Sequence, residues 1–221
     1  MIIREIGKDE KNIIDRVVKI HLDTFEGFFL TFMGEGFLKQ MYSSYCAHGE
    51  SGLLAAFDDD GSVVGFLAYS GDMSGLYKHM IKKRLVPFAW YSFGAFLRKP
   101  KVFMRLIRAF LKPSESEREE AYMELASIGV DPNVKSKGVG SALVDKLKEL
   151  TDFSKYAYIT LETDAENNEG ANKFYCKNGF SLVREYATHE GRKMNEYRYS
   201  CSEATVLEAN ETGDNTKGVE E

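Results

Sequence analysis

The stretch VDPNVKSKGVGSALV (residues 130–144) comes after an apolar run and contains two glycines one residue apart. Gly138 and Gly140 stand where a helix is expected to begin, and inside a helix each costs up to about 1 kcal/mol relative to alanine. One reason to keep them is that a ligand approaches the backbone closely. A helix N-terminus presents free N–H groups, so the loop predicts an anion site, usually for phosphate, to which Lys135 and Lys137 add charge. A tight strand-to-helix turn explains the glycines equally well, and the motif alone leaves both interpretations open.

The segments that follow this loop alternate between helices and strands. Apolar runs rich in β-branched and aromatic residues predict strands, and apolar residues three or four apart predict helices. Leu143, Leu147 and Leu150 share one helix face, and Gly179 stands where a helix C-terminal glycine is expected. From residue 121 onward we expect a strand (121–130), a helix (138–150), a strand (156–163), a short helix (169–178) and two strands (180–188 and 193–201) joined by a turn.

The N-terminal part of the chain predicts two helices and a hairpin. An Asp-Gly pair between two apolar strands is a strong hairpin signal. The resulting order indicates an α/β (α+β) fold with an antiparallel front half and a strand-loop-helix-strand centre. The expected elements are a strand (1–6), a helix (13–25), a helix (36–45) and the two hairpin strands (53–57 and 63–70).

The composition fits one globular domain. The chain has 221 residues, 43% of them hydrophobic, which is enough for one substantial core. We expect a single domain at residues 1–201 and a poorly ordered acidic tail at residues 202–221. Three widely spaced cysteines without a C-x-x-C pair favour a reducing compartment. Neither a signal peptide nor a run of 18 apolar residues is evident, so we expect a cytoplasmic protein that is neither secreted nor membrane-spanning.

Residues 73–114 contain ten lysines and arginines and no acid, although the net charge of the chain is -5. Residues 99–113 predict an amphipathic helix, and residues 81–99 add the only tryptophan and more cations. We interpret 73–114 as a basic amphipathic helical insertion. Three roles stay open: packing on the core with a solvated face, contact with an anionic membrane at its inner face, or recognition of a phosphate-bearing substrate. Nucleic acid is not expected, because no nucleic-acid motif accompanies the charge.

A dinucleotide-binding fingerprint is one candidate for the glycine loop, and it fits poorly. Glu162 stands near the place of the acid that this fingerprint needs about 20 residues after its glycines. However, seven residues separate the expected strand from Gly138, and Leu143 occupies the place of the third glycine. We therefore favour another phosphate ligand.

Two motifs support that choice. Lys135, Gly138 and Gly140 match the pattern Q/R-x-x-G-x-G/A, with lysine in place of Gln or Arg. A second pattern downstream, N-x-x-A-x-x-F/L-Y-x-x-x-G-F, is matched by Asn168, Ala171, Phe174, Tyr175, Gly179 and Phe180. Two motifs in this order, about 30 residues apart, are much more specific than either alone. Through them the sequence resembles the GNAT superfamily of acetyl-CoA-dependent N-acetyltransferases, most clearly between residues 122 and 180.

This resemblance implies a centrally splayed sheet, flanked by helices, that binds acetyl-CoA. The strand before the loop would splay from its neighbour and hold the pantetheine arm through its amides, and Gly129 is expected to allow the irregularity that splaying requires. No metal is expected, since His21, His48, His79 and His189 show no metal spacing. The residues that the resemblance assigns to acetyl-CoA are Ile128, Val130, Lys135, Ser136, Lys137, Gly138, Val139, Gly140, Ser141, Asn168 and Tyr175.

Two residues are candidates for proton transfer. Some members of the superfamily use a glutamate 14 residues before the first loop glycine as general base, and Glu124 stands at that spacing. In the superfamily a tyrosine can protonate the departing thiolate, and the resemblance assigns this role to Tyr175. Each has a structural alternative: a charged residue at a strand edge for Glu124, and a core aromatic for Tyr175. Asn168 also suits a helix N-cap, and we interpret Cys176 as a packing residue rather than a nucleophile.

The predicted function is therefore direct transfer of acetyl from acetyl-CoA to a primary amine of a small molecule. Residues 21–45 loosely resemble the first two helices of bacterial acetyltransferases associated with surface-polysaccharide synthesis. That likeness favours an amino sugar or a nucleotide-linked amino sugar as the acceptor. A peptide acceptor and a non-catalytic module that binds CoA or a membrane are the alternatives.

Overall fold

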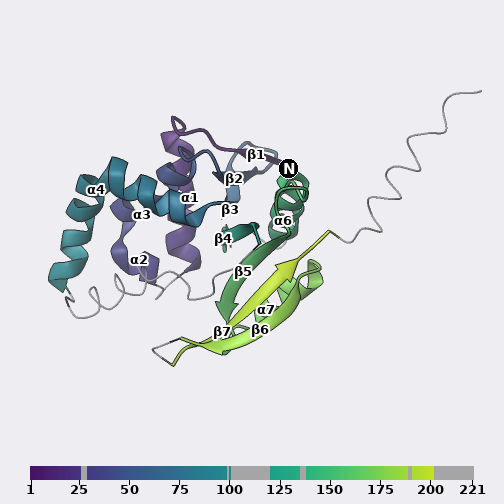
Figure 1. Ribbon diagram of the computed structural model, residues 1–221. Helices are drawn as coiled ribbons and strands as arrows, with labels where there is room; N and C mark the ends of the chain where they lie inside the picture. The colour runs from purple at the N-terminus through teal and green to yellow at the C-terminus, as the bar shows by residue number, and fades with distance from the viewer. Residues whose placement is uncertain (26–28, 99, 101–119, 135–137, 189–190, 202–221) are drawn as a thin grey trace, which may run out of the picture.

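A twisted sheet of seven strands runs through the part of the chain that the computed structural model describes, which is residues 1–25, 29–98, 100, 120–134, 138–188 and 191–201 (Figure 1). Its strand order is β1-β2-β3-β4-β5-β7-β6. Among the described strands, only β4 and β5 pair in parallel. The strands are β1 (Ile2–Glu5), β2 (Ser51–Phe57), β3 (Val63–Ser70), β4 (Tyr122–Val130), β5 (Tyr158–Asp164), β6 (Ser181–Ala187) and β7 (Lys193–Tyr199).

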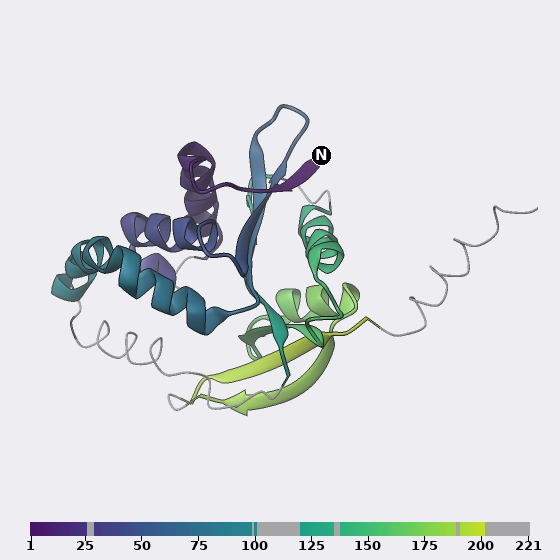
Figure 2. The same cartoon turned by 45° about the horizontal axis from the view of Figure 1, so that its top comes forward.

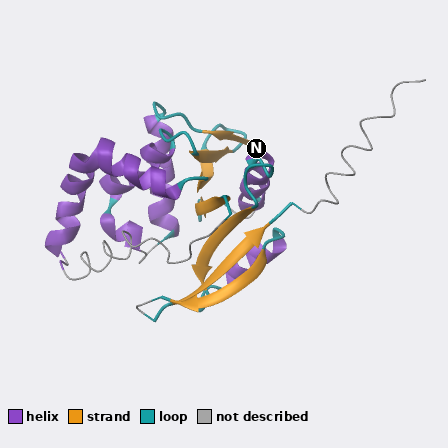
Figure 3. Cartoon of the chain, in the orientation of Figure 1, coloured by secondary structure: helices purple, strands orange, loops and turns teal. Residues whose placement is uncertain are grey.

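Helices cover both faces of this sheet. Helices α1, α3 and α4 lie on one side of the sheet and α6 and α7 on the other, as Figures 2 and 3 show. Each side has its own buried cluster of hydrophobic side chains against the sheet. The helices are α1 (Lys11–Thr24), α2 (Phe29–Met33), α3 (Glu35–Tyr45), α4 (Met73–Arg98), α6 (Val139–Leu150) and α7 (Glu169–Lys177).

The β2–β3 hairpin confirms the Asp-Gly prediction and shows its cause. Gly61 has a φ of 77°, a left-handed conformation that glycine adopts at no steric cost. The Asp58 carboxylate accepts hydrogen bonds from the backbone N–H groups of Asp60 and Ser62, at 3.1 and 2.8 Å. Backbone conformation and side-chain capping therefore fix this turn together.

Helix α4 covers the first part of the segment that we predicted to be a basic insertion, and it is bent. Pro87 lies inside the helix, and Arg84 has non-helical backbone angles (φ -135°, ψ 17°). Proline lacks an N–H donor and its ring clashes with the carbonyl four residues earlier, which accounts for the break at this level of the helix. Arg84 spans the break by donating to Gln40 Oε1 on α3 at 2.7 Å. Residues 99 and 101–119, where the amphipathic helix was predicted, lie outside the described residues.

The other expected elements are confirmed within two residues at every end, and α2 is an additional short helix. The mixed α/β sheet flanked by helices is thus as predicted. The tail at 202–221 lies outside the described residues. None of the described helices combines the length and the apolar character that crossing a membrane would require.

Candidate active site

The sheet opens between β4 and β5. These strands pair only at Tyr122–Glu124 with Tyr158–Thr160, and their pairing stops beyond Glu124. The Asp131 N–H donates to Val64 O on β3 at 2.9 Å. Because N–H groups alternate sides along a strand, the N–H groups of Ile128 and Val130 point the other way, toward the side that β5 has left. The predicted splay is therefore present, with two amides directed to its open edge.

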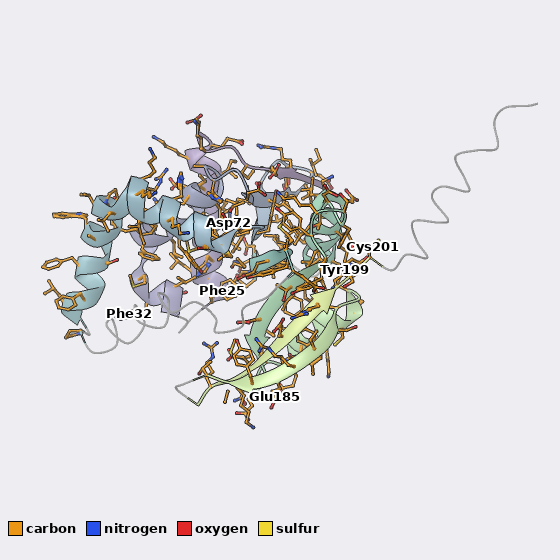
Figure 4. The ribbon with its side chains drawn as sticks, in the orientation of Figure 1. Phe25, Phe32, Asp72, Glu185, Tyr199 and Cys201 are labelled. Carbon is orange, nitrogen blue, oxygen red and sulfur yellow. The ribbon has the colours of Figure 1, made fainter. Side chains whose placement is uncertain are left out.

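We had expected the irregularity of β4 at Gly129, but the structure places it at Ala126. Pairing with β3 shifts register so that Ala126 has no residue opposite it, which is the geometry of a β-bulge. Gly129 has a different role. A Cβ atom at this position would lie 2.7 Å from the Phe66 ring and 3.5 Å from the ring of Phe25, the side chain labelled in Figure 4 at the end of α1. Gly129 is small because the Phe66 ring leaves no room for a Cβ atom, whereas the distance to Phe25 is an ordinary contact.

Gly138 and Gly140 have separate structural reasons. Gly138 is the N-cap of α6 in a left-handed conformation with φ of 73°, and a Cβ there would meet no atom within 4 Å. A Cβ on Gly140 would lie 3.1 Å from the Phe174 ring. Gly138 is thus required by its backbone conformation and borders open space. Gly140 is small because the Phe174 ring of the second motif packs against it.

The start of α6 retains the features of an anion site. No side chain caps its first N–H groups among the described residues. Val139 is buried and Ser141 is half-buried in the first turn. An uncapped helix N-terminus directs several N–H donors and a partial positive charge outward. The predicted contacts of Lys135, Ser136 and Lys137 fall outside the described residues.

Tyr175 lies on α7 within the buried cluster of the α6 and α7 side. Its side chain packs edge-on against Phe174 and Phe180 and beside Tyr197, with ring centroids 5.3 to 6.0 Å apart. Burial raises the pKa of this phenol to about 12. Tyr175 is thus a core aromatic that stays protonated at neutral pH, so the two interpretations of this residue are compatible.

Two asparagines fix α7 to the end of β5. Asn168 is the N-cap residue, but its side chain does not cap the helix; it donates to Thr163 Oγ1 at 2.7 Å. Asn172 donates to the Asp164 carbonyl oxygen at 3.0 Å and accepts from Tyr197 Oη at 2.9 Å. Asn172 was not predicted, although it lies one helical turn after Asn168. These bonds hold the helix that carries Tyr175.

Glu124 lies on the opposite face of the sheet from Tyr175, at the last paired position before the splay. Burial raises the pKa of Tyr77 on α4, and the negative charge of Glu124 raises it further. The same charge acts on the buried Tyr45 of α3, whose pKa is raised mainly by burial. A carboxylate among tyrosines from two helices differs from a simple solvated strand edge, the structural alternative that we had weighed.

A buried polar chain next to this region was missed by sequence reasoning. His21 on α1 shares a hydrogen bond of 2.7 Å between Nδ1 and Tyr42 Oη, and Tyr42 donates to Ser127 Oγ of β4 at 3.5 Å. Burial lowers the pKa of His21 to about 4. Its Nε2 has no hydrogen-bond partner among the described residues. The only sequence signal was the place of His21 on the apolar face of its predicted helix.

Two further expectations can be compared with the structure. Cys176 is exposed, so its interpretation as a packing residue is wrong: α7 turns this side chain to solvent and Tyr175 to the core. Within the described part of the chain, no three His, Cys, Asp or Glu side chains gather in a way that could hold a metal ion.

Comparison with known proteins gives a family match over most of the chain. A model described as "Acetyltransferase (GNAT) family" matches residues 14–180. No curated protein sequence matches.

Several solved structures share the fold at low sequence identity. Naa20 from Chaetomium thermophilum, in complex with a bisubstrate analogue, is 15% identical with a TM-score of 0.56, over 94% of this chain and 90% of that one. NAA60 from Arabidopsis thaliana, in complex with acetyl-CoA, is 16% identical with a TM-score of 0.53, over 90% and 97%. A ribosomal-protein-alanine N-acetyltransferase from Brucella melitensis is 13% identical with a TM-score of 0.55, over 91% and 100%.

Proposed function

We propose that this chain, which belongs to the acetyltransferase (GNAT) family, transfers the acetyl group of acetyl-CoA directly to a primary amine. The observation that carries the proposal is the end of β4–β5 pairing at Glu124 and Thr160. It leaves two β4 amides directed to the open edge and puts a carboxylate where the opening begins. One element thereby offers donors for a thioester arm and a base for an amine.

The residues present fit acetyl-CoA as co-substrate. Open space beside Gly138 lets a ligand reach the backbone, and the uncapped start of α6 suits a pyrophosphate. The amides of Ile128 and Val130 suit the polar groups of an extended arm. Acetyl-CoA supplies an activated acetyl group as a thioester. We also assign Asn168 a contact with acetyl-CoA, in addition to its hydrogen bond to Thr163.

Glu124 would remove a proton from the acceptor. A lysine-like amine with a pKa near 10.4 must be deprotonated against about 4.6 kcal/mol at pH 7, whereas an amine near 7.7 needs only about 1. A carboxylate beside the acceptor matters most for the more basic amine. The tyrosines around Glu124, especially Tyr77, supply ring surface and hydroxyl groups on the same side of the sheet.

Tyr175 would return a proton to the departing sulfur. A phenol whose pKa is about 12 is almost fully protonated near neutral pH, so the donor is always loaded. Its ring is held by Phe174 and Phe180, which fixes the direction of the hydroxyl. The acid and the base thus come from opposite faces of one sheet.

The acceptor that we propose is an amino sugar, as in surface-polysaccharide synthesis. It rests on the likeness of residues 21–45 to that type of enzyme and on the tyrosine-rich surroundings of Glu124. A peptide amine is the alternative acceptor, because one structural neighbour is named as a ribosomal-protein-alanine N-acetyltransferase.

The test is an acetyl-CoA-dependent screen. The full chain is incubated with acetyl-CoA and either amino sugars, nucleotide-linked amino sugars, polyamines or peptides, while free CoA thiol and product mass are measured. We expect thiol release that depends on an amino sugar, with a mass gain of one acetyl group on its nitrogen. Release that depends on a peptide instead would overturn the acceptor. Binding of acetyl-CoA without release for any amine would identify a non-catalytic module.

A further inference from the structure

The C-terminal half of α4 carries an apolar face with no partner in the described structure. We define the outer face of α4 as Leu85, Val86, Trp90, Phe93 and Leu97, whose exposed fractions lie between 57% and 78%. At about 100° per residue these side chains lie within roughly 140° of the helix circumference. Figure 4 shows side chains along this helix projecting away from the body of the molecule. Contiguous exposed apolar side chains of this size usually mark an interaction site.

The inner side of the same half-helix is anchored. Phe88 packs edge-on against Phe37 of α3 with ring centroids 4.9 Å apart. The Tyr91 ring lies against Gly36, where a Cβ would come within 2.2 Å of it, and Ser92 is buried. These contacts hold the helix in place without the outer face. The outer face is therefore not needed to keep the helix attached to α3.

Positive charge accompanies this face. Helix α4 contains five lysines and arginines and no acid, although the whole chain has a net charge of -5. Lys78, Lys82 and Lys83 are exposed just before the outer face. An apolar face next to basic side chains is the pattern of a helix that lies in the interface of an anionic membrane.

We propose that α4 docks this chain on an anionic lipid bilayer, with Trp90 and its apolar neighbours inserted at the level of the headgroups. The charge argues against a second copy as the partner of the outer face, because a two-fold symmetric contact would bring two surfaces of the same positive charge together. The charge also argues against residues 101–114 as the segment that covers the outer face, because they contain four further cations and no acid. The described helices are too short or too polar to span a bilayer, so contact at the surface is the mode that fits.

Trp90 is the only tryptophan of the chain, so the protein carries its own reporter at the centre of the outer face. The full chain is mixed with vesicles of phosphatidylcholine alone, or with about one third phosphatidylglycerol, and followed by flotation and by Trp90 emission. We expect binding, with emission moved to shorter wavelength, only with phosphatidylglycerol. Raising the salt from about 0.1 M to about 1 M shortens the screening length from about 10 to about 3 Å and should reduce binding.

Two double variants, each with a matched control, separate apolar insertion from charge. Leu85→Ser with Phe93→Ser should lower the partition coefficient at least tenfold, while Leu182→Ser with Val183→Ser, also exposed but on β6, should leave it unchanged. Lys82→Ala with Lys83→Ala should lower it about thirtyfold, from about 1 kcal/mol for each cation near the surface. Lys8→Ala with Lys11→Ala, equally exposed lysines near the start of α1, is the matched control.

Three results would overturn this assignment. The first is no partition into phosphatidylglycerol vesicles. The second is partition that the outer-face variants leave intact. The third is short-wavelength Trp90 emission in the vesicle-free protein. This result would mean that residues 101–119 or another copy of the chain already cover the outer face. Sedimentation of the free protein distinguishes these two possibilities, because only the second changes the mass of the particle.

Discussion

The two faces of the sheet are built in different ways. On the α6 and α7 side, the candidate site depends on backbone features: a left-handed Gly138, an uncapped helix start and strand amides at the splay. On the α1, α3 and α4 side, it depends on side chains from helices far apart in the sequence, such as His21 and Tyr42, gathered over β4. Backbone features leave short motifs in a sequence, whereas a cluster assembled by tertiary packing leaves almost none.

The largest expected effect compares one residue from each face. Tyr175→Phe and Glu124→Gln should each lower turnover by about 10² to 10⁴ while acetyl-CoA affinity stays nearly the same, because each removes only a proton-transfer group. Glu124→Gln should also remove the limb of the pH–rate profile that reports a base. Stopped-flow or steady-state thiol release with the true acceptor measures both effects.

Tyr186→Phe and Glu149→Gln are matched controls for these two variants. Tyr186 is a tyrosine of β6 that donates to Glu162, and Glu149 is an exposed glutamate of α6 that pairs with Lys146. Both should keep wild-type turnover. Wild-type turnover in Tyr175→Phe and Glu124→Gln themselves would show that the proposed acid and base are wrong.

The next effect concerns the buried histidine of the α1, α3 and α4 side. The pKa of His21 falls from 6.5 in the unfolded chain to about 4 in the folded protein. Between these values the unfolded chain binds a proton that the folded protein does not, so stability is complete above pH 6.5 and falls as the pH is lowered to 4. The contribution of His21 to this fall is about 3 kcal/mol.

Urea unfolding of wild type and His21→Asn at pH 7 and pH 4 measures this contribution. The free energy of unfolding should fall by about 3 kcal/mol less in the variant, since asparagine does not titrate. His79→Asn is the control, because His79 is far less buried and should change the pH dependence little. Equal falls in wild type and His21→Asn would show that His21 is not held neutral by its surroundings.

The smallest expected effect tests the backbone side. Gly138→Val should weaken acetyl-CoA binding at least about tenfold, since the side chain would occupy the open space at the start of α6 and strain a φ of 73°. Gly61→Val, at a φ of 77° in the β2–β3 turn, carries the same strain and should leave affinity intact. Calorimetry measures the affinity for acetyl-CoA. Equal affinities of Gly138→Val and wild type would show that acetyl-CoA does not bind at this loop.

Sequence reasoning reached the parts of the molecule that depend on local rules. The hairpin at Gly61, the helix start at Gly138 and the order of strands follow from turn chemistry and periodicity. The β-bulge at Ala126 was not predictable, because alanine has no bulge signature and the register depends on β3. The reason for Gly129 was misjudged for a related cause: Phe66, which requires it to be small, comes from another strand.

The contact between Gly140 and Phe174 also bears on how this protein can evolve. A Cβ at position 140 would lie 3.1 Å from the Phe174 ring, so alanine needs only a small shift of that ring, whereas a branched side chain needs the ring to shrink or leave. One contact therefore couples the side-chain sizes that the two motifs allow, although about 30 residues separate them. A lineage that enlarges residue 140 beyond alanine must first, or at the same time, reduce residue 174.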